Sequence, residues 1–400
     1  METNFTSVVS LCSCPGRPTN DSEECVEGLF ERHSWLDILT RFDPVAVYAD
    51  RVITPIWYII GIFGNAVSFT IWQKRRMRMN NNSAYYLSAL ALSDLCFLLL
   101  HICMELKVAW GLRSLDQRYV CEIFMAAYYL PQYLSPMLVL GATLDRYVVV
   151  CLPFKGPLLC TKAKTIQKLF LALAFALLLC TAQAYLWQYD TQRKTCTLRE
   201  ETFLGRDLGT IWTWCSEMLI FFIVPLVILF INIRVIIAIW KVSLDGPVAV
   251  KKTGNNKHCV ITRHESKGST KITSTVMLLS VSFFVITLTF PATIVYAVHY
   301  AVPQGNKCLS DEEIRTDSTW QSYFTYITAR KFVEEICLAH HACNFIIYYI
   351  TGNKFRLAFR RLLQTAKSVL CSYKRVCAPG YAKPLALDVI RPHNTRNTKL

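Results

Sequence analysis

The sequence Thr143-Leu144-Asp145-Arg146-Tyr147 closes a long apolar segment that begins near Cys121. At about 1.5 Å per helical residue, the stretch from Cys121 to Arg146 measures roughly 37 Å, which is enough to carry a chain from one face of a bilayer to the other. The triplet Asp145-Arg146-Tyr147 alone is a weak signal, because any given tripeptide also turns up by chance in unrelated sequences. Its position at one membrane face, with a thiol at the other, makes it specific.

Several more apolar blocks of this length lie before and after it in the chain. Of the 400 residues, 53% are hydrophobic and 18% are charged, which predicts a polytopic membrane protein. A lone strand would leave backbone groups unpaired in lipid, and the sequence lacks the alternating pattern of a barrel, so helices are the expected form. The predicted fold is an all-α membrane protein, a seven-transmembrane helix bundle, with spans at about 47–72, 83–108, 120–151, 166–187, 208–240, 272–300 and 322–351.

The seventh block differs from the other six. Its outer half carries Arg330, Lys331, Glu334 and Glu335, which leaves a short apolar core at residues 336–350. Ionised side chains are costly in lipid. We therefore expect this block to span the membrane only if those charges face an aqueous cavity.

The distribution of charge predicts the orientation. The formal net charge is +15, and the excess of Lys and Arg follows the first, third, fifth and seventh blocks, whereas residues 1–46 are acidic. By the positive-inside rule, we expect an extracellular amino terminus and a cytoplasmic carboxyl terminus. The first ten residues lack a signal-peptide pattern, so the first span is the expected insertion signal. Cations along one membrane face favour anionic lipids and a cytosolic protein as neighbours over nucleic acid.

Three appendages flank this membrane domain or interrupt it. Residues 1–46 form a predicted extracellular segment with glycosylation acceptors at Asn4 and Asn20. Residues 243–271 form a polar inner loop without apolar periodicity. Residues 352–370 alternate apolar and basic side chains at near-helical spacing, which predicts an amphipathic helix on the membrane surface, and residues 371–400 form a cytoplasmic tail.

The cysteines fall into groups by expected compartment. Cys121 and Cys196 lie outside and are able to form a disulfide there. A second bridge from Cys25 to Cys308 would draw the amino-terminal segment toward the last outer loop, but Cys12 and Cys14 are also outside, and the sequence leaves the connectivity open. Cys371 and Cys377 lie inside, beyond the basic amphipathic stretch. We expect S-acylation there, with plain free thiols as the alternative.

Polar side chains recur deep inside the apolar blocks. Asn65, Asp94, Ser135 and Asn344 fall at similar depths in four different spans. An ionised carboxylate at that depth needs donors, a proton or a cation. Oxygen ligands from Asp94, Ser135 and Asn344 would suit a sodium ion, and a hydrogen-bonded core that only fixes helix packing is the alternative.

The charges at the inner end have two interpretations. Arg146 is ordinarily read as an anchor whose charge reaches the membrane surface. The neighbouring Asp145 suggests instead a charge pair that holds the bundle in one of two arrangements, provided that protonation or a partner breaks it. Physical reasoning alone leaves both open.

These motifs together resemble those of rhodopsin-like (class A) G-protein-coupled receptors. The resemblance implies that an agonist lets the inner half of the sixth span swing out, which opens a cleft for a G protein around Asp145, Arg146 and Tyr147, with Tyr348 stabilising the open form. Two departures are Thr289, where the family usually has Trp, and Phe345, where Pro is usual. The matching residues are Gly64-Asn65, Leu90 to Asp94, Cys121 with Cys196, Asp145-Arg146-Tyr147, Cys151-Leu152-Pro153, Pro225, Pro291, Asn344 to Tyr348 and Phe355-Arg356.

Single positions narrow the ligand class that the resemblance implies. Tyr128 stands where amine receptors carry Asp, and Leu338 stands where opsins carry the retinal Lys, so both classes are disfavoured. An acidic, aromatic pocket suits a cationic peptide terminus. In the alternative, Glu334 and Glu335 pair with Arg330 and Lys331 and touch no ligand. The predicted pocket residues are Glu105, Tyr128, Tyr129, Gln132, Glu334 and Glu335.

The sequence therefore predicts a plasma-membrane receptor for a neuropeptide, similar to receptors of the FMRFamide kind. We expect it to catalyse nucleotide exchange on a heterotrimeric G protein without being an enzyme itself, and arrestin and a receptor kinase are further expected partners. A transporter or channel is a rival, but it predicts inverted repeats that the sequence lacks. A receptor-like protein that has lost signalling is a second rival, and a small non-peptide ligand is the alternative ligand class.

Overall fold

The computed structural model describes Cys14 and residues 18–19, 22–23, 28–79, 81–191, 194–199, 201–203, 205–244 and 265–376. The chain divides into two units, residues 1–356 and residues 357–400, which are described separately. The predicted modification sites Asn4, Asn20 and Cys377 lie outside the described residues. The side chain of Cys371 is not described either.

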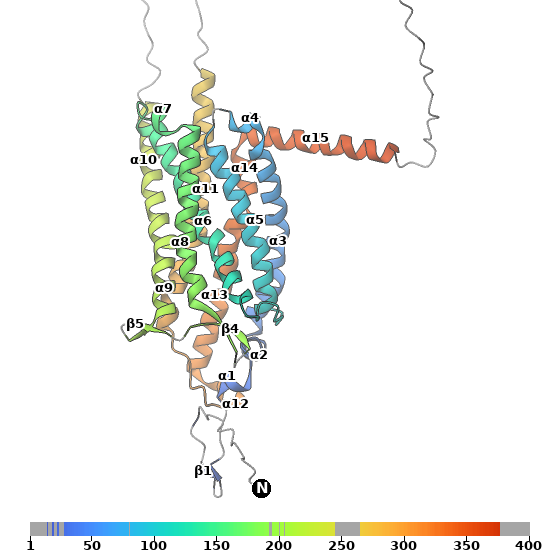
Figure 1. Cartoon of the computed structure of the whole chain (residues 1–400), viewed down its shortest axis with the longest axis vertical. Coiled ribbons are helices and arrows are strands. Elements are labelled where there is room, and N and C mark those ends of the chain that lie inside the picture. The colour runs from blue at the N-terminus through green and yellow to red at the C-terminus, as the bar shows by residue number, and fades with distance from the viewer. Residues whose placement is uncertain are drawn as a thin grey trace, which may run out of the picture. The chain divides into compact units, whose positions relative to one another are not determined.

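Long helices form a bundle in the first unit (Figure 1). The second and third have the predicted bounds, and several others are longer than predicted. Their bounds are Pro44–Gln73 (α3), Ser83–Val108 (α5), Val120–Cys151 (α6), Lys162–Leu186 (α8), Leu208–Glu217 (α9), Met218–Ile223 (η1), Val224–Leu244 (α10), Glu265–Val298 (α11), Ser318–Ala342 (α13) and Asn344–Thr351 (α14).

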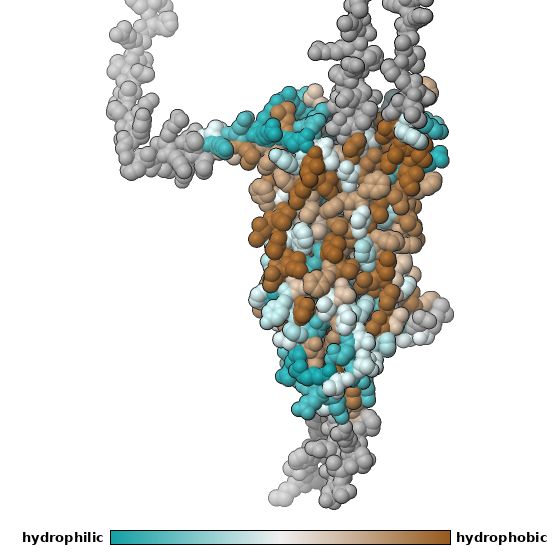
Figure 2. All heavy atoms as spheres, turned by 180° about the vertical axis from the view of Figure 1, so that it is seen from behind, coloured by the Kyte–Doolittle hydropathy of each residue, from teal (hydrophilic) through white to brown (hydrophobic). Residues whose placement is uncertain are grey.

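Six spans among the described residues are long and apolar enough to cross a membrane. The seventh, α13 followed by α14, is not one of them, because its first half carries the four charges noted above. It packs against α3 and α11 all the same, so the bundle contains seven spans. One face of the bundle shows a band of hydrophobic surface, and hydrophilic residues gather at one end (Figure 2).

Several helices begin earlier than predicted, and in α3 and α8 a capping residue accounts for the earlier start. The side chain of Asp43 accepts a hydrogen bond from the backbone N–H of Ala46 at 3.4 Å, and Pro44 occupies the first turn, so α3 begins at residue 44. Thr161 likewise accepts from the N–H of Lys164 at 3.3 Å at the start of α8. These caps are local signals that the apolar pattern alone does not contain.

The fifth span contains one turn of π-helix, η1, just before Pro225. Proline has no N–H, so it leaves the carbonyl of the residue four positions earlier, Phe221, without its helical donor. The hydroxyl of Thr293 in α11 donates to that carbonyl at 3.0 Å. The irregular turn therefore joins the fifth span to the sixth.

Short elements connect the spans. β3 (Trp187–Asp190) pairs with β4 (Thr195–Leu198) antiparallel, with Tyr189 opposite Cys196. The other short elements have these bounds: Pro18–Thr19 (β1), Ser22–Glu23 (β2), Leu29–Arg32 (α1), Trp35–Phe42 (α2), Arg75–Arg78 (α4), Gly156–Leu159 (α7), Thr202–Phe203 (β5), Arg206–Asp207 (β6), His299–Ala301 (η2) and Asp311–Thr316 (α12).

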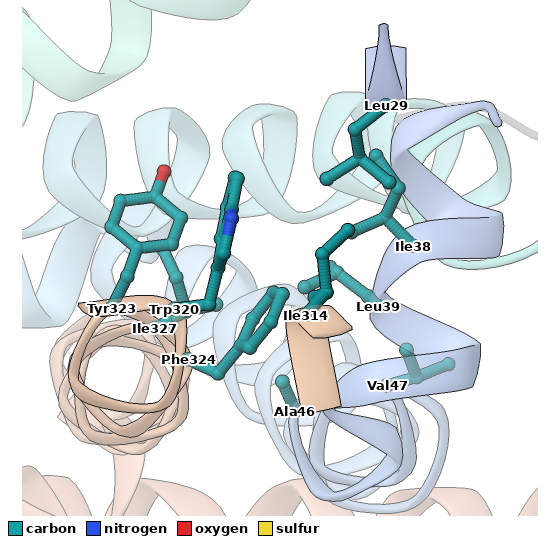
Figure 3. Packing of buried hydrophobic residues seen from close by; sticks show 10 residues of the cluster. All are labelled: Leu29, Ile38, Leu39, Ala46, Val47, Ile314, Trp320, Tyr323, Phe324 and Ile327. Atoms are coloured by element: carbon teal, nitrogen blue, oxygen red, sulfur yellow. The ribbon is translucent and has the colours of Figure 1, made fainter. Parts of the chain in front are cut away.

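Residues 28–46 are folded and not merely a polar appendage. We call α1, α2, α12 and residues 318–327 at the start of α13 the cap. Its core buries Leu29, Ile38, Ile314 and Trp320 completely (Figure 3). The apolar side chains of residues 29–47 lie on one face of successive short helices, which explains why this stretch packs onto the seventh span.

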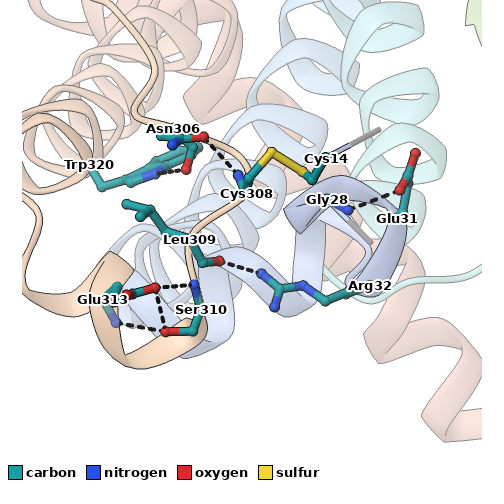
Figure 4. Close-up of a disulfide and its surroundings, with 10 residues drawn as sticks. All are labelled: Cys14, Gly28, Glu31, Arg32, Asn306, Cys308, Leu309, Ser310, Glu313 and Trp320. Atoms are coloured by element: carbon teal, nitrogen blue, oxygen red, sulfur yellow. Dashed lines mark hydrogen bonds between the residues drawn. A yellow bond between two sulfur atoms is a disulfide. The ribbon is translucent and has the colours of Figure 1, made fainter. Parts of the chain in front are cut away.

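A disulfide joins the cap to the preceding segment, but not with the predicted partner. Cys308 pairs with Cys14 and not with Cys25, so that prediction is wrong (Figure 4). Neighbouring bonds fix the loop: Arg32 donates to the carbonyl of Leu309 at 2.6 Å, and the Trp320 indole N–H donates to the carbonyl of Asn306 at 3.0 Å. Several cysteines share this part of the sequence, so spacing alone does not select the partner.

A helix, α15 (Asn353–Val376), follows the seventh span and runs beyond the predicted residue 370. Apolar residues alternate with Lys and Arg along it, which confirms an amphipathic helix. Its position on the membrane surface stays a prediction.

Candidate functional site

A cavity of about 260 Å3 lies between α5, α6, η1, α11 and α13. Four of the predicted pocket residues line it, namely Glu105, Tyr128, Gln132 and Glu334. The cavity also receives Glu217 from α9 and Lys331 from α13, neither of which was predicted as a pocket residue. It is therefore polar on some walls and aromatic on others, as expected for a site that orients a ligand.

Two predicted pocket residues point elsewhere. Tyr129 stacks on Tyr133 with ring centroids 5.7 Å apart and joins an apolar cluster with α8. Glu335 accepts a hydrogen bond from Thr54 on α3. Each follows a true lining residue by one position, and one helical step of about 100° turns a side chain to another face. The predictions for Tyr129 and Glu335 are therefore wrong.

Most charges at the mouth of the seventh span are paired with each other. Arg330 contacts Glu334 at 2.7 Å, and Lys331 contacts both Glu334 at 3.5 Å and Asp50 of α3 at 2.8 Å. Tyr296 also donates to Glu334 at 2.9 Å. The cations of Arg330 and Lys331 thus balance the carboxylates of Glu334 and Asp50. Glu334 therefore pairs within the protein, as the alternative interpretation of the sequence expected.

Glu105 is different. Its side chain is 9% exposed, and its Oε1 atom has no hydrogen-bond partner among the described residues. A buried carboxylate oxygen without a donor costs free energy unless a ligand or water completes it. Glu217, an acidic residue inside an otherwise apolar run, brings a second carboxylate to the same cavity. That interruption of the apolar run was the available sequence signal for Glu217.

Aromatic rings form another wall. Phe97 lies 5.7 Å from Tyr128, centroid to centroid, and Phe124 stacks on Tyr128 at 6.1 Å. The Tyr58 hydroxyl and the His101 ring share a hydrogen bond of 2.7 Å. This wall offers flat apolar faces to a ligand.

The floor of the cavity leads to Asp94. Ser135 donates to Asp94 Oδ1 at 2.9 Å, Asn344 donates to Oδ2 at 2.8 Å, and His341 Nδ1 lies 2.7 Å from Oδ1. The predicted residues Asp94, Ser135 and Asn344 are thus brought together. Asn65 bonds instead to the backbone carbonyl of His341 at 2.7 Å, so it joins the first span to the seventh without touching the carboxylate.

The opposite end of the bundle holds the charged triplet. Arg146 donates to Ser83 at 2.6 Å and to Asn81 at 3.3 Å, both near the start of α5. Asp145 pairs with Lys168 of α8 and also accepts from Thr165 at 3.4 Å. The pairing of Asp145 therefore differs from the expected one with Arg146. Two sets of bonds, one for each charge, hold this end together.

Tyr348 and Tyr147 occupy different surroundings at that end. Tyr348 is fully buried, with its ring 5.5 Å from Trp72 and 5.5 Å from Phe355. Tyr147 is half-buried on the last turns of α6. Tyr348 is therefore packed into the bundle in this structure.

At the cavity end, the predicted disulfide between Cys121 and Cys196 is confirmed. Asp116 braces it, because it accepts from the Cys196 backbone N–H at 2.9 Å and from Lys107 at 2.6 Å. Burial alone would raise the pKa of Asp116, but these donors and the Lys107 charge together lower it.

The sequence matches a known family over most of its length. Residues 64–348 fit the model of the 7 transmembrane receptor (rhodopsin family). The chain belongs to this family. As a rhodopsin-family receptor it is a multi-pass membrane protein, which decides against the transporter or channel alternative.

Curated relatives are receptors of the same kind. The chain is 26% identical to the growth hormone secretagogue receptor type 1 of Sus scrofa over 42% of its length and 47% of the relative, and 27% identical to the neurotensin receptor type 1 of Mus musculus over 37% and 35%. It is 24% identical to the thyrotropin-releasing hormone receptor of Bos taurus over 90% and 89%. The chain thus spans about half or less of the first two relatives.

Proposed function

We propose that the chain is a plasma-membrane receptor that binds a cationic neuropeptide and catalyses nucleotide exchange on a heterotrimeric G protein. The observation that carries the ligand class is the carboxylate oxygen of Glu105 in the cavity, which has no hydrogen-bond partner in the described part of the chain. The names of the relatives, which include neurotensin and thyrotropin-releasing hormone receptors, support a peptide or hormone ligand.

The charge balance of the cavity supports a cationic group on the ligand. Glu334 already has Arg330 and Lys331 as partners, so the acidity left for a ligand comes from Glu105 and Glu217. A guanidinium or terminal ammonium would complete Glu105 with a charge-assisted hydrogen bond. The aromatic wall at Tyr128 would take an apolar neighbour in the same peptide.

Two features of the Arg146 end support coupling. The first is the kind of contact that holds Arg146 and Asp145. Among the described residues these contacts are hydrogen bonds and one ion pair, with no disulfide, so a protein partner is able to compete for the two side chains. The second is Phe154, whose side chain is 98% exposed beside α7, with Leu158 67% exposed. Exposed large apolar side chains next to a polar end suit contact with a protein partner. In this proposal the Arg146 end faces the cytosol and the disulfides lie outside.

The ligand class is tested by screening amidated basic peptides against cells that express the chain, followed by binding to Glu105→Gln. We expect this variant to weaken binding of the peptide at least tenfold, because it removes a buried charge partner. Glu312→Gln, an exposed acidic residue of the cap, is the matched control and should bind as the wild type does. Unchanged affinity in Glu105→Gln would refute the acidic subsite.

The coupling role is tested separately with Arg146→Ala. We expect ligand-stimulated GTPγS binding to be lost while ligand binding persists. Arg76→Ala removes an exposed cation near the same end and should keep exchange intact. Full exchange in Arg146→Ala would support the alternative of a role confined to membrane anchoring.

A further inference from the structure

The carboxylate of Asp94 has an unusual partner for so deep a site. The His341 Nδ1 atom lies 2.7 Å from Oδ1, and the side chains of Asp94 and His341 are 0% and 4% exposed. Sequence reasoning singled out oxygen donors around Asp94 and missed this ring.

The other positions around the carboxylate are filled as well. Ser135 donates at 2.9 Å to Oδ1, the oxygen that His341 contacts, and Asn344 donates to the second oxygen at 2.8 Å. Ser93 shares a hydrogen bond of 3.0 Å with Ser135, so that hydroxyl is engaged too. Both oxygens of Asp94 therefore already have a polar side chain at hydrogen-bond distance.

A sodium ion fits this donor set poorly. Hard cations prefer several oxygen ligands, but here an imidazole nitrogen stands at hydrogen-bond distance from the carboxylate. The ring is also held in place, since its centroid lies 4.1 Å from that of Phe97 and 3.7 Å from that of His340. An ion would have to displace a packed ring.

The bond between His341 and Asp94 occupies a carboxylate oxygen that a cation would need. A hydrogen bond of 2.7 Å between these two atoms requires a proton on one of them. Either a ring N–H donates to the carboxylate or a protonated carboxyl donates to the ring nitrogen, and in both cases the imidazole takes up a contact position at Oδ1.

We infer that His341 takes the place of a sodium ion at Asp94, so that this receptor does not bind sodium in its core. The same ring lines the ligand cavity together with Phe97. The ring therefore contacts both the cavity and the core carboxylate. The inference concerns the ion alone and holds whether or not the proposed ligand is correct.

The test measures sodium binding directly and needs no ligand. Full-length receptor in lipid nanodiscs is unfolded by heat in NaCl and in choline chloride at equal ionic strength, followed with a thiol-reactive dye that reports buried cysteines such as Cys180. An ion that binds only the folded state raises the midpoint temperature. We expect the wild type and Asp94→Asn to respond equally to the exchange of salts. A sodium-specific rise in the wild type that Asp94→Asn lacks would overturn the inference.

His341→Ser sharpens the test, because it removes the ring and leaves a hydroxyl. We expect this variant to gain a sodium-specific rise of roughly 2 °C or more. The double variant with Asp94→Asn should lose that rise. If His341→Ser folds and shows no gain, the ring is not what excludes the ion. If it does not fold, the comparison of wild type with Asp94→Asn still decides.

Discussion

The two ends of the bundle are held together by different kinds of bond. At the cavity end, two disulfides and a buried apolar core tie the cap and the loops to the helices. At the Arg146 end, hydrogen bonds to Ser83 and Asn81 and the ion pair of Asp145 with Lys168 join the helices beside the packed rings around Tyr348, and the described residues have no disulfide there. A disulfide resists rearrangement, whereas hydrogen bonds and ion pairs exchange with a partner or with water. The contrast suits a molecule that binds at a fixed end and changes shape at the other.

The largest effect is expected from breaking the core of the cap. Trp320→Ala removes a fully buried ring and should destabilise the protein by about 3–5 kcal/mol. Thermal unfolding of purified receptor measures the loss. Trp110→Ala, in which the removed ring is 53% exposed, is the control and should have a much smaller effect. Equal losses in the two variants would show that the cap core contributes little.

Opening the cap disulfide should have a comparable or smaller effect. Cys308→Ser frees the segment at Cys14 and is expected to cost about 2–5 kcal/mol, measured in the same way. Cys215→Ser changes a free, exposed thiol and should leave the midpoint unchanged. A wild-type midpoint in Cys308→Ser would mean that the cap is held by its apolar core alone.

These two regions also differ in how well the sequence predicts them. Long apolar runs and helical spacing are local, so the spans and the meeting of Asp94 with Ser135 and Asn344 were predictable. The cap was not, because its short helices are stable only through packing on the seventh span and the disulfide partner depends on that packing.

Errors in the cavity have a similar cause. A position on a helix fixes the depth of a side chain more reliably than its direction, so Tyr129 and Glu335 were placed one residue away from true lining positions. His341 was missed because a histidine in an apolar run usually has no special partner. Only the folded structure brings it to Asp94.

A smaller effect is expected at the Arg146 end. Ser83→Ala removes an acceptor 2.6 Å from Arg146, worth about 1.5–3 kcal/mol for a hydrogen bond to a charged group. Since that bond ties Arg146 to the start of α5, we expect its loss to raise ligand-independent GTPγS binding. Ser280→Ala, an exposed hydroxyl on α11, should leave it at the wild-type level. No rise in Ser83→Ala would mean that this bond does not restrain the switch.

The smallest effect concerns pH at the cavity end. Folding lowers the pKa of Asp116, so its contribution to stability is present above the unfolded pKa of about 4 and is lost as the pH falls through the folded value. The midpoint difference between wild type and Asp116→Asn should therefore shrink between pH 6 and pH 3. A constant difference over that range would show that the charge of Asp116 is not what stabilises the loop.

The irregular turn before Pro225 also joins two spans beside the ligand cavity. The Thr293 hydroxyl donates a hydrogen bond to the Phe221 carbonyl, and both residues also line the ligand cavity. A bound molecule that accepted a hydrogen bond from this hydroxyl would remove this contact between the sixth span and the fifth. Ligand binding and the loss of this contact then involve the same oxygen atom.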